Sequence, residues 1–98
     1  MAQIRWTNTA AAWLEDIFHY IAQDSPDAAT KVAAGIYDRV QLLAKFPTMG
    51  HVYRSEPEGE VRVLLYGHYR IAYLFRAADD VVEILGVFHG AMDISRYL

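Results

Sequence analysis

A two-residue loop between two apolar runs constrains the fold of this chain more than any other feature of its sequence. The dipeptide Gly67-His68 separates runs at 61–66 and 69–76 that are rich in tyrosine and branched residues, which favour strands. A glycine at the first position of such a loop is typical of a type II′ turn, whose twist matches that of paired strands. The sequence therefore predicts a β-hairpin over these residues.

Two further strands complete the predicted sheet. Residues 77–80 predict a turn, and the apolar run from Val81 to Phe88 then predicts the last strand of an antiparallel meander. Gln3 to Trp6 predicts a short opening strand that joins the same sheet. The segment 56–60, directly ahead of the hairpin, has the composition of a polar turn.

Residues 10–21 have the apolar spacing of an amphipathic helix, and polar side chains at 7–9 can cap its start. Its apolar stripe is wider than the usual core-facing stripe because aromatic residues flank it. Those aromatics either seal the core or face a partner protein, and the sequence leaves both alternatives open. The stripe consists of Ala10, Leu14, Ile17 and Ile21, with Trp13, Tyr20 and Phe18 at its sides.

A second helix is predicted after a short link at Gln23-Asp24. Ser25 and Pro26 suit the cap and the first helical position, and the early acidic residue Asp27 complements the helix dipole. The segment 46–50 ends this helix in the prediction. Its apolar face consists of Ala29, Val32, Ala33, Ile36, Val40 and Leu43.

These elements predict an α+β fold with the order β-α-α-β-β-β, in which a helical hairpin packs on one face of a small antiparallel sheet. The length of 98 residues predicts a single domain, 1–98, which is large enough to form one hydrophobic core without covalent cross-links. The chain has no cysteine, which excludes disulfides and thiolate metal sites. No apolar run approaches the roughly 20 residues of a membrane span, so we expect a cytoplasmic protein that does not enter a membrane.

The net charge restricts the partners that this chain can bind. Nine basic and twelve acidic residues give a net charge of −3 and a pI near 5.7. A protein whose main function is to bind nucleic acid usually carries a basic surface that neutralises phosphates. Direct RNA binding by this chain would therefore depend on a local basic patch.

No motif for a metal or a cofactor is present in the sequence. The four histidines are widely spaced, and no glycine-rich segment joins a strand to a helix, so we expect neither a metal nor a cofactor. The candidates that remain form a basic and aromatic set on the predicted meander and just after it. This set consists of Arg62, His68, Tyr69, Arg70, Arg76, His89 and Arg96.

Two interpretations of this set stay open on pattern alone. An arginine could stabilise a phosphorane while a histidine or tyrosine moves protons, which is the chemistry of RNA cleavage. Alternatively, His89 merely ends a strand and the arginines pair with glutamates, namely Glu56, Glu58, Glu60 and Glu83.

Six short motifs follow one another along the whole chain. They are Ala10-x3-Leu14-x2-Ile17-x2-Tyr20-Ile21, Ser25-Pro26-x-Ala28-Ala29, Leu43-x3-Pro47-x2-Gly50, Val61-Arg62-x-Leu64, Gly67-x-Tyr69-Arg70-Ile71-x-Tyr73 and Val82-x-Ile84-Leu85-x-Val87-x-His89-x2-Met92-Asp93. No single motif is specific, but in this order they resemble the RelE/ParE superfamily of bacterial toxins.

The resemblance implies the toxin half of a type II toxin–antitoxin pair. A cognate antitoxin would wrap and neutralise it, and operator DNA would be bound only through that antitoxin. Members of the RelE-like branch resemble ribosome-dependent mRNA endoribonucleases, whereas ParE-like members inhibit DNA gyrase and lack a recognised nuclease centre. Three features favour the ParE-like branch: the acidic chain, the absence of lysine between 50 and 62, and the His89-x-x-Met92-Asp93 ending before Leu98.

Two positions depart from the superfamily pattern. Met92 stands where many members have arginine, and Gly86 stands where a basic residue is common. Both departures weaken the nuclease hypothesis, and they leave open an altered target or a reduced potency.

The resemblance also implies which residues make contacts. In the RelE-like branch the catalytic residues would be Arg62, Arg70 and His89. The wide apolar stripe on the first helix itself predicts Trp13 and Tyr20 as antitoxin contacts. The segment after the last strand is expected to serve activity and to be dispensable for folding, unless its apolar residues Met92, Ile94 and Leu98 tie it to the sheet. The predicted target contacts of the ParE-like branch are Arg62, Arg70, His89, Met92, Asp93, Arg96 and Tyr97.

Overall fold

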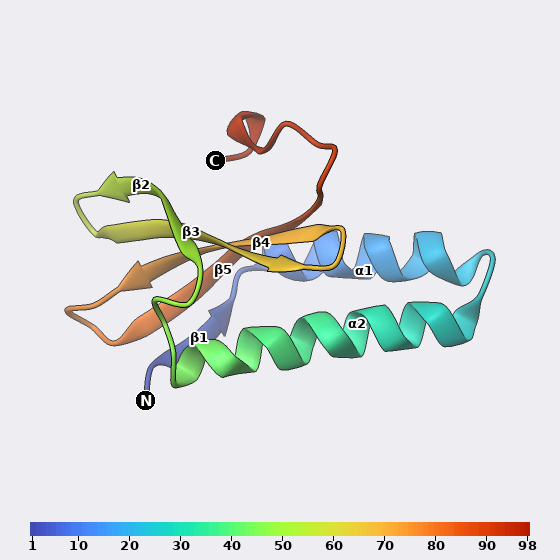
Figure 1. The fold of residues 1–98 in the computed structure, drawn as a ribbon, viewed down its shortest axis with the longest axis horizontal. Helices are drawn as coiled ribbons and strands as arrows, with labels where there is room; N and C mark the ends of the chain where they lie inside the picture. Colours follow the sequence, from blue (N-terminus) through green and yellow to red (C-terminus); the bar gives the residue numbers. More distant parts are fainter.

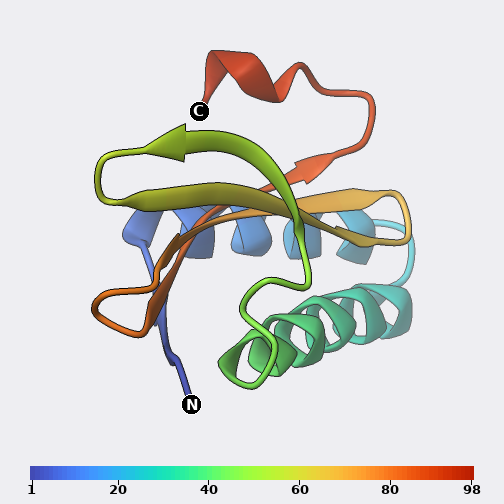
Figure 2. The same ribbon diagram turned by 60° about the vertical axis from the view of Figure 1, so that its left-hand side comes forward.

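The computed structural model describes residues 1–98, and its five strands form one mixed sheet in the order β1-β5-β4-β3-β2. Two antiparallel helices lie on one side of the sheet, and the C-terminal segment crosses the other side (Figure 1, Figure 2). The elements are β1 (Gln3–Trp6), α1 (Asn8–Ala22), α2 (Pro26–Gln41), η1 (Leu42–Ala44), β2 (His51–Glu56), β3 (Gly59–Tyr66), β4 (Tyr69–Arg76), β5 (Val81–His89) and η2 (Ile94–Arg96). The predicted α+β class is confirmed.

Both helices begin where their capping residues predict. The Thr7 hydroxyl accepts a hydrogen bond from the Ala10 N–H at 3.1 Å, and the Ser25 hydroxyl accepts one from the Ala28 N–H at 3.2 Å. The second helix ends earlier than predicted, because α2 stops at Gln41 and the 3-10 turn η1 follows it. Neither helix combines the length and apolar character that a membrane span requires.

The hairpin loop at Gly67-His68 forms as predicted. Tyr66 pairs with Tyr69 across the loop, so the loop has two residues. Gly67 has a φ of +57°, and His68 is not among the residues with positive φ. A positive φ at the first loop position alone is the type II′ pattern, which glycine adopts without strain.

The strand β2 was not predicted from the sequence. It pairs antiparallel with β3 at the edge of the sheet, so the meander has four strands instead of three. The sequence signal is weak because all residues of β2 except Glu56 are exposed, which leaves no alternation of buried and exposed positions. Its register also shifts between Val52 and Arg54. The sheet is mixed because β1 runs parallel to β5.

The main core lies between the helices and the sheet, and Tyr73 is its largest fully buried side chain. The Tyr73 hydroxyl donates a hydrogen bond to the Pro47 carbonyl at 2.7 Å and accepts one from the Gly50 N–H at 2.9 Å. Tyr73 thereby ties β4 to the segment that connects the helices to β2. Burial raises the pKa of Tyr73 above its ordinary value.

Replacing Tyr73 with phenylalanine should lower the free energy of unfolding at neutral pH by about 1–3 kcal/mol, because two buried backbone groups lose their partner. The raised pKa adds a pH dependence: the unfolded chain loses this proton first, so the stabilising contribution falls as pH rises above about 10. Urea unfolding of both proteins across alkaline pH measures this. We expect Tyr73→Phe to lose stability less steeply, and equal slopes would contradict the assignment.

A second, smaller apolar cluster lies on the other side of the sheet, under the C-terminal segment. Val63, Ala72 and Phe88 supply the strand side of this cluster, and Ile94 of η2 packs onto them. Ile94 is only 4% exposed. This packing supports the alternative that the apolar residues of the terminal segment tie it to the sheet. We therefore expect the segment to contribute to folding, against the expectation from the sequence.

Candidate interaction groove

A groove of about 570 Å³ lies at the end of β5 that is farthest from β1. β1 pairs only with the first half of β5, from Val81 to Ile84, and the chain then turns into α1. α1 therefore packs beside the rest of β5. The groove is lined by Trp13, Asp16, Ile17, Tyr20, Tyr69, His89 and Met92.

This groove brings together residues that the sequence analysis had assigned to two different partners. Trp13 and Tyr20 are the predicted antitoxin contacts, and His89 and Met92 are predicted target contacts. Tyr20 is 75% exposed, whereas Trp13 is partly buried. The surface is mostly apolar, and Asp16 is the only carboxylate among its lining residues.

His89 is the last residue of β5, and its exposed side chain lines the groove. Its ring meets the ring of Tyr69 edge-on, with centroids 5.8 Å apart, and lies 6.5 Å from the ring of His68. The Nδ1 atom of His89 accepts a hydrogen bond from the Ala91 N–H at 3.2 Å. The neutral ring therefore carries its proton on Nε2 and can donate that proton to a ligand.

The turn after β5 is held by several hydrogen bonds. The Gly90 N–H donates to the His68 carbonyl at 2.6 Å, and the Met92 N–H donates to the His89 carbonyl at 3.0 Å. The Arg70 Nη2 donates to the Met92 carbonyl at 2.5 Å and to the Gly90 carbonyl at 3.3 Å. Arg70 is thus engaged with the backbone of this turn.

Arg62 lies on the opposite face of the sheet from Arg70. Arg62 is opposite Tyr73, which belongs to the core under the helices, whereas Arg70 is opposite Phe88, which belongs to the second cluster. The Arg62 side chain is 13% exposed and pairs with Glu60 at 2.8 Å. The structure therefore separates Arg62 from the other two candidate nuclease residues, Arg70 and His89, which line a common hollow of about 310 Å³.

Arg62 also donates hydrogen bonds to backbone carbonyls, at 2.5 Å to Gly50 and at 3.0 Å to Thr48. The pairing of strand arginines with glutamates, which the sequence analysis kept as an alternative, occurs three times. These pairs are Arg54 with Glu56, Arg62 with Glu60, and Arg76 with Glu83.

The remaining predicted target contacts lie on the C-terminal segment, where two of them have structural roles. The Asp93 carboxylate accepts hydrogen bonds from the N–H and the hydroxyl of Ser95 at 3.2 and 2.6 Å, and so caps η2. Tyr97 stacks on Phe88 at 5.5 Å and meets Trp13 edge-on at 5.2 Å. Arg96 is exposed on η2.

Sequence reasoning missed Asp16, took Ile17 for a core residue only, and named Tyr69 as a candidate for chemistry but not as a binding contact. The α1 side of the groove could have been recognised from the sequence. Its four residues follow the i, i+3, i+4, i+7 spacing of one helix face: Trp13, Asp16, Ile17 and Tyr20. No pattern indicated which end of the sheet this face would meet.

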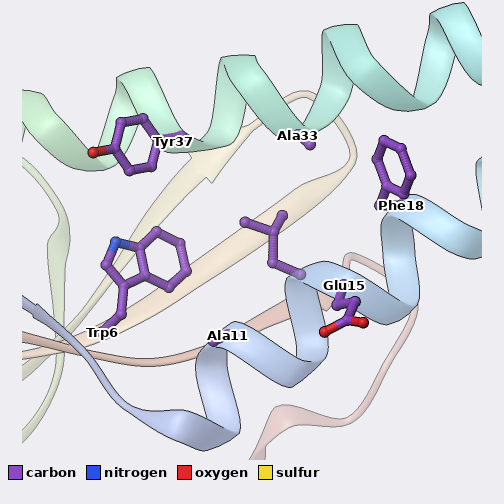
Figure 3. Close-up of a pocket in the computed structure, with 7 residues that line it drawn as sticks. Trp6, Ala11, Glu15, Phe18, Ala33 and Tyr37 are labelled. Carbon is purple, nitrogen blue, oxygen red and sulfur yellow. The ribbon is translucent and has the colours of Figure 1, made fainter.

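A second hollow of about 320 Å³ lies between α1 and α2, and it contains no predicted site residue (Figure 3). Ala11 and Ala33 lie on its two helical sides, and Trp6 enters it from the end of β1. The indole Nε1 of Trp6 is buried and has no hydrogen-bond partner. Such a group is destabilising unless it is paired.

Comparison with known proteins identifies relatives along nearly the whole chain. A family model described as the ParE toxin of a type II toxin–antitoxin system, parDE, matches residues 4–94. The chain is 42% identical over 87 residues to the candidate toxin Y4kP of Sinorhizobium fredii, covering 89% of this chain and 86% of that protein. It is 33% identical over 91 residues to the toxin RelE2 of Caulobacter vibrioides, covering 93% of this chain and 98% of that protein.

Two solved structures are similar in fold. A chain of the chromosomal ParDE system from P. aeruginosa matches with a TM-score of 0.70 and 28% identity, covering 91% of this chain and 96% of that one. A chain of the toxin–antitoxin complex RelBE2 from Mycobacterium tuberculosis matches with a TM-score of 0.65, 24% identity and 93% coverage of both chains, a likeness of fold alone.

The helical hairpin, the five-stranded sheet and the relatives together define a toxin of the RelE/ParE superfamily. Within that superfamily, the chain belongs to the ParE toxin family of type II toxin–antitoxin systems.

Proposed function

We propose that this protein is the toxin of a type II toxin–antitoxin pair, that a cognate antitoxin neutralises it in the cytoplasm, and that its target is DNA gyrase. The observation that carries the choice of target is the placement of the arginines. Arg62 and Arg70 lie on opposite faces of the sheet and bind partners within the chain, so the two arginines do not form one nuclease centre with His89. A toxin that acts by binding requires no such centre.

In this proposal the toxin is not a catalyst. It binds gyrase through the groove and the adjoining C-terminal segment, and it holds the enzyme in a state in which the cut DNA is not resealed. His89 supplies a hydrogen-bond donor to the target, and Met92 supplies an apolar contact. Arg96 and the exposed part of Tyr97 extend the contact along η2.

The antitoxin would cover the same groove. The similar chain from P. aeruginosa belongs to a ParDE toxin–antitoxin system, which supports an antitoxin partner for this chain. The lining is apolar apart from Asp16, His89 and the tyrosine hydroxyls, so it suits a segment with large apolar side chains and one lysine or arginine opposite Asp16. Because predicted antitoxin and target contacts share this groove, the antitoxin would exclude gyrase sterically.

Tyr20→Ala should weaken antitoxin binding about thirtyfold or more, because buried aromatic anchors typically contribute about 2 kcal/mol or more to an interface. The free energy of unfolding should not change, since the Tyr20 side chain is largely exposed in the free toxin. The matched control is Tyr37→Ala on α2, a 49% exposed tyrosine that does not line the groove. Calorimetric titration with the antitoxin measures both affinities, and wild-type affinity of Tyr20→Ala would place the interface elsewhere.

A second candidate function is ribosome-dependent mRNA cleavage. It is favoured by the exposed His89 ring beside Tyr69 and His68, which are groups that can move protons. Primer extension on translated messages tests this candidate, and inhibition of supercoiling by purified gyrase tests the proposed one. We expect inhibition of supercoiling and no cuts, whereas cuts at fixed positions within codons would replace the gyrase proposal.

A further inference from the structure

Arg70 lies beneath the C-terminal segment and not in the groove. It occupies β4 opposite Leu65 of β3 and Phe88 of β5. Its strand neighbours Tyr69 and Ile71 point toward the helices, and Ala72 shares its own side of the sheet. Tyr69 therefore lines the groove and Arg70 does not. The Arg70 guanidinium lies on the other face of β4 and reaches the turn after β5.

The turn that Arg70 approaches determines the position of two groove residues. His89 is its first residue and Met92 its last, and they are linked by the bond from the Met92 N–H to the His89 carbonyl. The Arg70 Nη2 donates to the carbonyls of Gly90 and Met92. A guanidinium is always charged, so these are the only charge-assisted hydrogen bonds in the turn.

We propose that Arg70 is a positioning residue that fixes the turn from His89 to Met92 so that both side chains line the groove, and that it does not contact the target. This inference rests on the proposed function only in taking gyrase as the target that the groove binds. Its structural content is independent: Arg70 sets the conformation in which the Ala91 N–H reaches the His89 Nδ1 atom and keeps the proton on Nε2.

The experiment uses Arg70→Met, which keeps much of the apolar stem and removes every donor. The matched control is Arg54→Met, because the Arg54 Nη2 binds the backbone oxygen of Leu98 at 2.5 Å and so holds the same segment at its other end. Nitrogen NMR of the His89 ring in the free toxin is the first readout. We expect a single Nε2–H tautomer in wild type and Arg54→Met, and a mixture of tautomers in Arg70→Met.

Inhibition of gyrase supercoiling is the second readout. We expect Arg70→Met to inhibit about tenfold less than wild type, since the donor His89 and the apolar contact Met92 are no longer held in place. Arg54→Met should stay within about twofold, the variation expected away from an interface centre. A thermal melt of each preparation confirms that it is folded. If Arg70→Met does not fold, Arg70→Lys, which retains one charged donor nitrogen, should give an intermediate share of the second tautomer.

Two outcomes overturn the proposal. If the His89 ring signals of Arg70→Met equal those of wild type, Arg70 does not set the turn. If inhibition is lost while those signals stay unchanged, Arg70 contacts the target directly. Failure of wild-type toxin to inhibit gyrase is a different result, because it removes the proposed target and leaves the NMR comparison in force.

Discussion

Ile94→Ala should lower the free energy of unfolding by about 2–5 kcal/mol, because Ile94 is 4% exposed and fills the space over Val63, Ala72 and Phe88. Removing the whole segment 92–98 should cost more, since the hydrogen bonds from Arg54 and Arg70 to its backbone are lost as well. A domain of this size is stabilised by only about 5–15 kcal/mol in total. The truncated chain should therefore be partly or wholly unfolded.

Urea denaturation of the purified toxin measures this effect, and Arg96→Ala is the control within the same segment. Arg96 is exposed on η2, so its substitution should change the free energy of unfolding by no more than about 0.5 kcal/mol. An Ile94→Ala midpoint equal to that of wild type would show that the segment does not pack on the sheet in solution. If Ile94→Ala is destabilised as expected, loss of toxicity on truncation would reflect lost folding and not lost target contacts.

His89→Ala should weaken gyrase inhibition by about thirtyfold, the factor expected for a central interface residue. The His89 ring is exposed and its one hydrogen bond is to the Ala91 N–H, so the melting temperature should remain close to that of wild type. The control is His51→Ala, an exposed histidine at the start of β2 that does not line the groove. Supercoiling assays over a range of toxin concentrations compare the three proteins, and equal potency of His89→Ala would remove His89 from the target surface.

The parts of the fold that were predictable are those in which burial alternates along the chain or a backbone rule acts locally. The Gly67-His68 loop and the caps at Thr7 and Ser25 depend on residues within four positions of one another, and all three formed as predicted. β2 was missed because an edge strand exposed on both sides has no alternation of burial to detect. The end of α2 was placed late because a 3-10 turn continues its apolar spacing.

The candidate site was only partly predictable because its geometry depends on contacts distant in sequence. The helix face with Trp13 and Tyr20 could be recognised from its spacing, but its meeting with His89 depends on where β1 ends. Arg70 was grouped with Arg62 because both are strand arginines. Their separation onto opposite faces follows from the register of β3 with β4, and the partners of Arg70 are backbone carbonyls 20 and 22 residues later. Composition contains no signal for such contacts.

The most direct test of the central claim is the accumulation of cut DNA in a reaction of purified gyrase, supercoiled plasmid and this toxin. After denaturation and proteolysis, linear plasmid reports the complexes in which gyrase had cut the DNA without resealing it. The proposal predicts that linear DNA increases with toxin concentration and falls to the background level when the antitoxin is bound to the toxin beforehand. No linear DNA at any toxin concentration, together with codon-specific cuts in translated messages, would contradict it.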